Sequence, residues 1–383
     1  MPTSHYDYAI VGAGAAGLNL VLTLAGDPYF EKKQILILEP DAKVANDRTW
    51  CYWEKGKGQY DEITTKIWPK AKFIYSKDEI DLEMSGYQYK MIQSANFYHH
   101  AKKVIETKGN VTWVNDKVNT IEESGSECTI VTETATYMAK FVFDSRISHE
   151  FHNNNDKYLR LLQHFKGWVI RTEKDCFDES AFTMMDFRLK WPQSTSFMYI
   201  LPLSKREALL EFTFFSPELV KESDYEEYIK KYIEDILNLD DYSITSEEKG
   251  IIPMSNFPFH HANTERVTKI GTAGGWVKPS SGYSFKNAIN YSKQIVSNLK
   301  NGDRPDHKLF KKRFRKYDAL FIDVLWHNNE LGEEIFSDMY RKNNANRIFS
   351  FLDEETTFFQ EVKIMNSFRK WPFTKALLRS FTY

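Results

Sequence analysis

Three glycines near the start of the chain have the spacing of a phosphate-binding turn. Gly12, Gly14 and Gly17 follow a short apolar run, residues 7–11, and precede an Ala/Leu-rich stretch that reaches Leu24. In this G-x-G-x-x-G arrangement the first glycine permits a tight turn and the second lets the backbone approach a pyrophosphate. The third lets a helix pack close to the strand. The free amides and the positive dipole of that helix N-terminus would face the phosphates.

A carboxylate stands where such a turn needs one. Glu39 ends a second apolar run, residues 35–38. An acid at this place accepts hydrogen bonds from ribose hydroxyls, and its charge disfavours a 2′-phosphate. A glycine-rich turn without a ligand is the alternative. Because the two strands, the helix and the acid occur together, the sequence predicts a bound dinucleotide.

Composition limits the class of protein. With 383 residues the chain is long enough for two connected domains with a sizeable core. The net charge of −2 gives no reason to expect nucleic-acid binding. The three cysteines are widely separated, which favours a reducing compartment over a disulfide scaffold or a thiolate metal site. The histidine pairs at 99–100 and 260–261 lack further ligands at metal spacing, so we expect no metal.

The sequence also argues against an integral membrane protein. The first residues lack the basic region and apolar core of a signal peptide. No stretch approaches the roughly 20 apolar residues of a spanning helix. We therefore expect a protein that is soluble or peripheral to a membrane.

The order of predicted elements indicates a discontinuous domain. After a helix over 94–108, short strands are expected at 111–114, 118–121, 129–132 and 141–143. Four further runs have the pattern of an antiparallel meander, at 167–171, 181–187, 195–203 and 207–215. A helix follows at 224–239.

A second strand, glycine turn and helix then begin at residue 267 and end at 299. This unit can return to the first sheet, which would make the nucleotide domain discontinuous. We therefore predict an α/β fold with a Rossmann-like nucleotide-binding domain, an inserted antiparallel β-sheet domain and a helical C-terminal region. Their predicted bounds are 1–150 with 264–303, then 151–263, then 304–383.

Together with the N-terminal turn, three segments resemble the flavin-dependent lycopene cyclases of the bacterial carotenoid pathway. They are Asp-Arg-Thr-Trp-Cys-Tyr-Trp at 47–53, the glycine-rich run at 271–285 that ends in Pro-Ser-Ser-Gly-Tyr-Ser-Phe, and residues 351–356. The resemblance runs over nearly the whole chain. It implies a fold like that of aromatic hydroxylases and geranylgeranyl reductases, with an FAD-binding Rossmann-like domain and a substrate-binding β-sheet domain.

The resemblance also implies a reaction. Lycopene, a linear polyene, is closed at its ends into β-ionone rings without net oxidation or reduction. The FAD must nevertheless be reduced, with NAD(P)H as the usual reductant. Ring closure needs a proton on the terminal double bond, attack by a second double bond, and loss of a different proton. Water must be excluded because it would trap the cation, and the aromatic content of 15% suits a pocket that stabilises positive charge.

Glu211 is the candidate proton donor that the resemblance implies. It lies where the family carries a Leu-Glu-Glu-Thr-like segment, although Phe212 here replaces the second acid. On a strand, Glu211 would share a face with Leu209 and Thr213, and a desolvated carboxyl there would have the raised pKa that a general acid requires. An exposed sheet face is the alternative. The run at 353–356 has a similar pattern, but we predict a helix N-cap and solvated first turn there and rank it behind Glu211.

A second glycine-rich segment would complete the cofactor site. Gly271, Gly274 and Gly275 resemble a second flavin motif, although Thr272 replaces its usual aspartate. The amide of Gly282 would lie near the carbonyls of the flavin ring.

The segment at 47–48 is the remaining cofactor contact. Arg48, with Asp47, would bind a flavin phosphate or order the cofactor loop. A surface ion pair between them is the alternative.

The expected partner is lycopene or a related linear carotene, which has almost no aqueous solubility. Basic and apolar residues alternate over 363–381, as in an interfacial helix, although an ordinary packed helix has the same pattern. We therefore expect a cytoplasmic protein held peripherally on the cytoplasmic face of the membrane. Two other functions stay open: an FAD-dependent monooxygenase or geranylgeranyl-reductase-like oxidoreductase, and a carotenoid-binding flavoprotein without catalysis.

Overall fold

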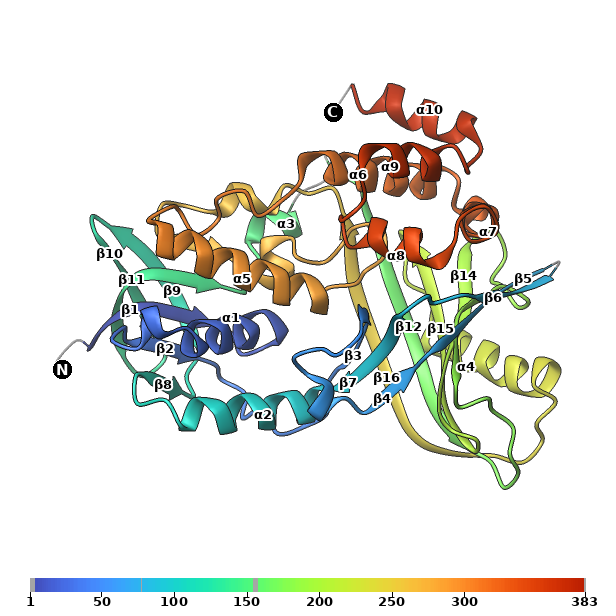
Figure 1. Ribbon diagram of the computed structural model, residues 1–383, viewed down its shortest axis with the longest axis horizontal. Coiled ribbons are helices and arrows are strands. Elements are labelled where there is room, and N and C mark those ends of the chain that lie inside the picture. Colours follow the sequence, from blue (N-terminus) through green and yellow to red (C-terminus); the bar gives the residue numbers. More distant parts are fainter. Residues whose placement is uncertain (1–3, 77, 154–157, 382–383) are drawn as a thin grey trace.

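The computed structural model describes residues 4–76, 78–153 and 158–381. Figure 1 shows an elongated molecule with one sheet and its helices at one end and a second sheet at the other. Both of these sheets have seven described strands, and a third sheet has three.

The first sheet has the predicted Rossmann-like core. Its strand order is β8-β2-β1-β11-β10-β9, with β17 beside β11. The bounds are β1 Ser4–Val11, β2 Ile35–Leu38, β8 Val111–Val114, β9 Val118–Ser124, β10 Glu127–Thr132, β11 Thr136–Asp144 and β17 Val267–Lys269. The β1, β2, β8, β11 and β17 strands run parallel, whereas β10 runs antiparallel to both of its neighbours, β11 and β9. The β2 strand is buried over its full length, as expected of a parallel strand covered by helices.

Three helices lie against this sheet. They are α1 Ala15–Gly26, α2 Ser94–Glu106 and α5 Phe285–Asn301, and α1 packs against both of the others (Figure 1). The pairing of Val142 in β11 with Val267 in β17 confirms that the second strand–glycine–helix unit returns to the first sheet.

The second sheet contains the predicted meander. Its order is β16-β12-β15-β14-β13-β5-β6. The bounds are β5 Lys70–Tyr75, β6 Asp78–Leu82, β12 Arg160–Arg171, β13 Ala181–Asp186, β14 Thr195–Ser204, β15 Glu207–Ser216 and β16 Ser243–Ser255. Two features differ from the expectation. The β16 strand was not predicted, and β5 and β6 come from the range 1–150, so residue 150 does not separate the two sheets.

The smaller elements connect these sheets. The three-stranded sheet has the order β3-β7-β4, with β3 Thr49–Lys55, β4 Lys66–Trp68 and β7 Tyr87–Gln93. The Asp-Arg-Thr-Trp segment thus leads into the β3 strand, in which Tyr52 and Trp53 are buried. A short helix, α3, spans His149–Asn153, and α4 Glu222–Lys231 continues as a π-helical turn, Tyr232–Ile236. Short 3-10 turns lie at Pro28–Phe30, Asp61–Ile63, Phe259–Ala262, Gly271–Gly274 and Asn329–Leu331.

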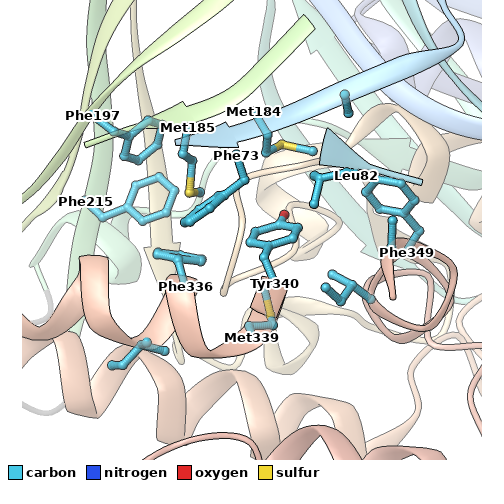
Figure 2. Close-up of a cluster of buried hydrophobic side chains, with 14 of the residues drawn as sticks. Phe73, Leu82, Met184, Met185, Phe197, Phe215, Phe336, Met339, Tyr340 and Phe349 are labelled. Carbon is cyan, nitrogen blue, oxygen red and sulfur yellow. The ribbon is translucent and has the colours of Figure 1, made fainter. Parts of the chain in front are cut away.

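Five helices form the C-terminal region. They are α6 Lys312–His327, α7 Gly332–Lys342, α8 Ala345–Leu352, α9 Phe358–Met365 and α10 Lys370–Arg379. Figure 2 shows how α7 joins the second sheet: Tyr340 and Phe336 lie against Phe73, Phe197 and Phe215. The rings of Phe73 and Tyr340 are stacked, with their centroids 4.6 Å apart. This core fixes the helices as one wall of the cavity described below.

Within the described residues, none of the helices has the length and apolar character needed to cross a bilayer.

Candidate active site

One large cavity, of about 1420 Å³, extends from the start of α1 along the second sheet to the C-terminal helices. Six of the predicted site residues line it: Gly14, Gly17, Arg48, Glu211, Gly271 and Gly282. The four others, Gly12, Glu39, Gly274 and Gly275, do not line it. The structure therefore brings the dinucleotide turn and the candidate acid into the same cavity.

The glycines of the first turn have different structural roles. Gly12 has a φ of +96°, and a Cβ there would stand 2.0 Å from Ser145 Oγ. A Cβ on Gly17 would stand 2.0 Å from the carbonyl oxygen of Gly12, so close packing requires both glycines. Gly14 caps α1 with a φ of −80°, and a Cβ there would meet no atom within 4 Å. Gly14 therefore leaves open space at the helix N-terminus, where a pyrophosphate would fit.

Glu39 supports this turn from behind. Its carboxylate is buried, with 7% of the residue exposed. One oxygen accepts a hydrogen bond from the Ala13 amide at 2.7 Å, and the other accepts one from the Asp41 amide at 3.0 Å. The acid predicted from the end of β2 is thus fixed beside the turn.

The second glycine segment closes over the first. A Cβ on Gly271 would lie 3.2 Å from the Cβ of Ala16 in α1. Gly274 is packed against the backbone, because a Cβ there would lie 2.2 Å from the carbonyl oxygen of Lys269. The Gly275 carbonyl accepts a hydrogen bond from Arg315. Gly271 is thus the one glycine of this group with a place on the cavity wall.

Two orphaned polar atoms mark the far side of the proposed cofactor site. Gln163 Oε1 and Ser281 Oγ are buried without a hydrogen-bond partner, and both residues line the cavity. Gly282 has a φ of +72°, and a Cβ there would stand 1.8 Å from Gln163 Oε1. Unpaired buried polar atoms are costly, so a ligand with polar edges would satisfy them. A flavin ring has such edges, and the site therefore fits the predicted FAD.

Asp47 orders the loop beside the cavity. Its carboxylate accepts hydrogen bonds from Ser94 Oγ and Tyr98 Oη, both at 2.8 Å. The amide of Arg48 donates to Ser94 Oγ at 3.0 Å, and its guanidinium donates to the Asp47 carbonyl at 2.6 Å. Asp47 thus orders the loop, which was one of the two roles expected of this segment. The contact of the Arg48 side chain with a flavin phosphate stays a prediction.

Glu211 lies on the cavity wall and not on an exposed sheet face. The residue is 6% exposed, and its carboxyl accepts a hydrogen bond from Thr213 Oγ1 at 2.6 Å. Leu209 and Phe215 of the same strand also line the cavity. Burial, and next the neighbouring Glu248 carboxyl, raise the pKa of Glu211 well above its ordinary value. A carboxyl in this environment keeps its proton to a higher pH than an ordinary glutamate does.

Glu248 is a second acid that the sequence reading missed. It lies on the edge strand β16, and its carboxyl accepts a hydrogen bond from Thr49 Oγ1 at 2.7 Å. Burial raises the pKa of Glu248. Another strand thus supplies the second carboxyl that is absent at Phe212. No local sequence pattern distinguishes Glu248 from the exposed charged residues beside it.

A line of buried hydroxyls continues from the acids. Tyr199 lies opposite Glu211 on β14. Its hydroxyl lies 2.7 Å from that of Tyr89, which in turn lies 2.7 Å from that of Tyr283. Burial raises the pKa of all three phenols, so they stay neutral and hold polar hydrogens inside a largely apolar cavity.

The competing acidic run is engaged in ion pairs away from the cavity wall. Asp353 pairs with Lys286, and Glu354 pairs with Lys278 at 3.2 Å. Burial raises the pKa of Asp353 to about 6. The expected N-cap position is wrong, because Asp353 follows the last residue of α8 and Thr357 caps α9.

The comparisons identify a family and a fold. A family model described as lycopene cyclase protein matches residues 7–378. A comparison with curated protein sequences gives no match.

Solved flavoprotein structures are similar over nearly their whole length. The flavin-dependent brominase Bmp2 is 13% identical with a TM-score of 0.64, and the match covers 91% of this chain and 93% of Bmp2. A geranylgeranyl bacteriochlorophyll reductase-like protein from Thermoplasma acidophilum is 12% identical with a TM-score of 0.60, covering 95% and 96%. Halogenase PltM, solved with phloroglucinol and FAD, is 11% identical with a TM-score of 0.60, covering 91% and 82%. They confirm the predicted fold class.

Proposed function

Since the chain belongs to the lycopene cyclase family, we propose that it is a lycopene β-cyclase. It would close the linear ends of lycopene into β-ionone rings by an FAD-dependent isomerisation. One observation carries the proposal: a buried carboxyl with a raised pKa, Glu211, lies in the same largely apolar cavity as the dinucleotide turn.

The residues around the turn would hold FAD. The amides at Gly14 would bind the pyrophosphate, and Glu39 would face the ribose after exchanging one of its backbone partners. Gln163, Ser281 and Gly282 would contact the ring. When bound and reduced by NAD(P)H, FAD would supply an electron-rich surface that stabilises positive charge.

The chain's own residues would carry the proton. Protonated Glu211 donates to the terminal double bond, the next reactive double bond attacks the cation, and a different proton leaves the new ring. No hydrogen is gained overall, so product and substrate are isomers. Aromatic rings on the cavity wall, including Phe197, Phe215 and Phe336, exclude water and face the cation.

An isotope experiment tests this reaction. In heavy water, each ring closed should acquire one solvent deuterium, and nicotinamide deuterated at its hydride position should contribute none. Reduced FAD without oxygen should support many turnovers, and the product mass should otherwise equal that of lycopene. Deuterium from the nicotinamide, or one turnover per flavin, would instead support the reductase or monooxygenase alternative. Pigment binding without turnover would support the binding protein.

The C-terminal helices would bring the enzyme to its substrate. Phe359 is 85% exposed and Trp371 67% exposed, unusual values for large apolar residues. The side chains of Phe368, Phe373 and Leu377, from the same region, line the cavity. We propose that this surface docks on the cytoplasmic face of the membrane and that the carotene enters the cavity beside it.

Removing these aromatic rings should weaken membrane binding. For Phe359→Ser with Trp371→Ser we expect binding to vesicles of anionic lipid to fall at least about tenfold, because each exposed ring would bury apolar area worth about 1.5–3 kcal/mol. Co-sedimentation measures the bound fraction. Val44→Glu changes an exposed apolar residue away from these helices and should bind normally. Unchanged binding of the double variant would contradict the proposal.

A further inference from the structure

Glu211, Gly167 and Glu248 form one row across three neighbouring strands. In the β12–β15 pairing Gly167 stands opposite Glu211, and in the β12–β16 pairing it stands opposite Glu248. Residues in register on neighbouring strands point to the same face of a sheet. Two acids therefore rise from the same face on either side of a residue without a side chain.

Gly167 keeps the space between them open. A Cβ there would lie 2.9 Å from Leu209 Cδ1 and 3.3 Å from Glu211 Cβ. A glycine inside a strand weakens the strand, and it often marks a place where other groups approach closely. Here it lets two carboxyls interact across the middle strand.

The described surroundings offer the pair hydrogen-bond donors but no ion-pair partner. Thr213 donates to Glu211, and Thr49 donates to Glu248. Among the ion pairs of the described residues none includes either acid. Cys51 from β3 and Tyr283 before α5 are the titratable groups that interact with the charge of the pair, and Tyr199 from β14 stands opposite Glu211. Tyr89 from β7 contacts the hydroxyls of the two tyrosines. Burial raises the pKa of each, so all four are neutral and leave the negative charge of the pair uncompensated.

We infer that Glu248 is a positioning residue which shares a single proton with Glu211 and, while ionised, keeps Glu211 in its protonated form. This inference rests on the proposed proton-initiated cyclisation. In a dry site, ionising two carboxylates this close together is costly, so the resting pair holds one proton. The half-buried Glu248, on an edge strand, keeps the charge more readily than Glu211. The proton passes from Glu211 to the substrate carbon, and the proton released from the new ring restores the pair.

The test is a titration of Glu248→Gln in the flavin-loaded protein. Removing the neighbouring charge should lower the pKa of Glu211, so we expect it to deprotonate about one pH unit or more below the wild-type value. Infrared spectroscopy can follow this deprotonation without substrate, through the carbonyl stretch of the protonated acid. The band is assigned to Glu211 by its loss in Glu211→Gln. The pH above which kcat falls should decrease by the same amount. At lower pH, kcat should be close to the wild-type value.

Two variants serve as controls. Glu247→Gln removes the adjacent charge, but Glu247 pairs with Lys166 at 3.2 Å and does not line the cavity, so the titration should not move. Glu248→Asp keeps the negative charge, so the pH above which kcat falls should be close to the wild-type value.

Three results would overturn the inference. An unmoved carbonyl titration in Glu248→Gln would show that the acids are independent. Equal loss of kcat at all pH values would assign Glu248 a direct chemical role. If the pH dependence of kcat in Glu248→Asp does not return toward the wild-type one, Glu248 has a packing role. Because the infrared titration needs no turnover, it separates failure of the pair from failure of the cyclase proposal.

Discussion

Replacing Glu211 with glutamine should lower lycopene cyclisation by about 10² to 10⁴-fold, the usual contribution of a general acid. Glutamine keeps the size of the side chain and the hydrogen bond from Thr213, but it has no proton to donate. The fold and FAD content should therefore be retained. The assay is product formation with reduced FAD in the absence of oxygen.

The pH dependence follows from the raised pKa of Glu211. An acid whose pKa is raised stays protonated over a wider range, so activity should persist above the pH at which an ordinary glutamate ionises and should be lost as pH rises through the raised pKa. A carboxyl with an ordinary pKa would ionise at about pH 4.3 and would give the opposite result, activity that is already lost just above that pH.

Matched variants make the Glu211 experiment specific. Glu207→Gln alters an acid at the start of the same strand, where it pairs with Arg171 at 2.9 Å, and should leave activity near normal. Glu354→Gln tests the competing acidic run and should mainly affect stability through the lost contact with Lys278. If Glu354→Gln were inactive while Glu211→Gln kept full activity, the assignment of the acid would be wrong.

The features that could be predicted from the sequence are those encoded locally. The turn needs glycine for reasons that are partly local, because Gly12 has a positive φ and a Cβ on Gly17 would collide with the Gly12 carbonyl oxygen. The β2 strand is a continuous apolar run because both its faces are covered. The meander strands could be recognised because their side chains are almost all buried, as in β15. In these elements, residue type and spacing carry the whole signal.

The second acid could not be found in this way. The β16 strand is an edge strand, and its first part, including Glu247 and Lys249, is exposed and charged. Natural edge strands often carry such charges, which hide them from a search for apolar alternation. The position of Glu248 relative to Glu211 depends on how β12 pairs with β15 and with β16 at Gly167. This register involves residues far apart in the sequence, so it cannot be predicted from one segment. The same holds for Asp353, whose partner Lys286 lies in α5.

Replacing Gly14 with valine should abolish FAD binding. At this position the backbone has a φ of −80°, which any residue adopts, and a Cβ would meet no atom of the chain within 4 Å. The protein should therefore fold normally, while the branched side chain fills the space at the start of α1 that a pyrophosphate would occupy. The expected product is colourless, with wild-type circular dichroism and no flavin absorbance after incubation with FAD.

Gly26→Val provides the matched control, because it places the same side chain at the other end of α1. That position is exposed and also has no atom within 4 Å of a Cβ, so FAD binding should be unchanged. Gly17→Val would not serve, since its Cβ collides with the Gly12 carbonyl and would disturb the fold as well as the site. A yellow, FAD-loaded Gly14→Val protein would place the pyrophosphate elsewhere in the cavity. It would also remove the main reason for assigning the open space at this helix N-terminus to the cofactor.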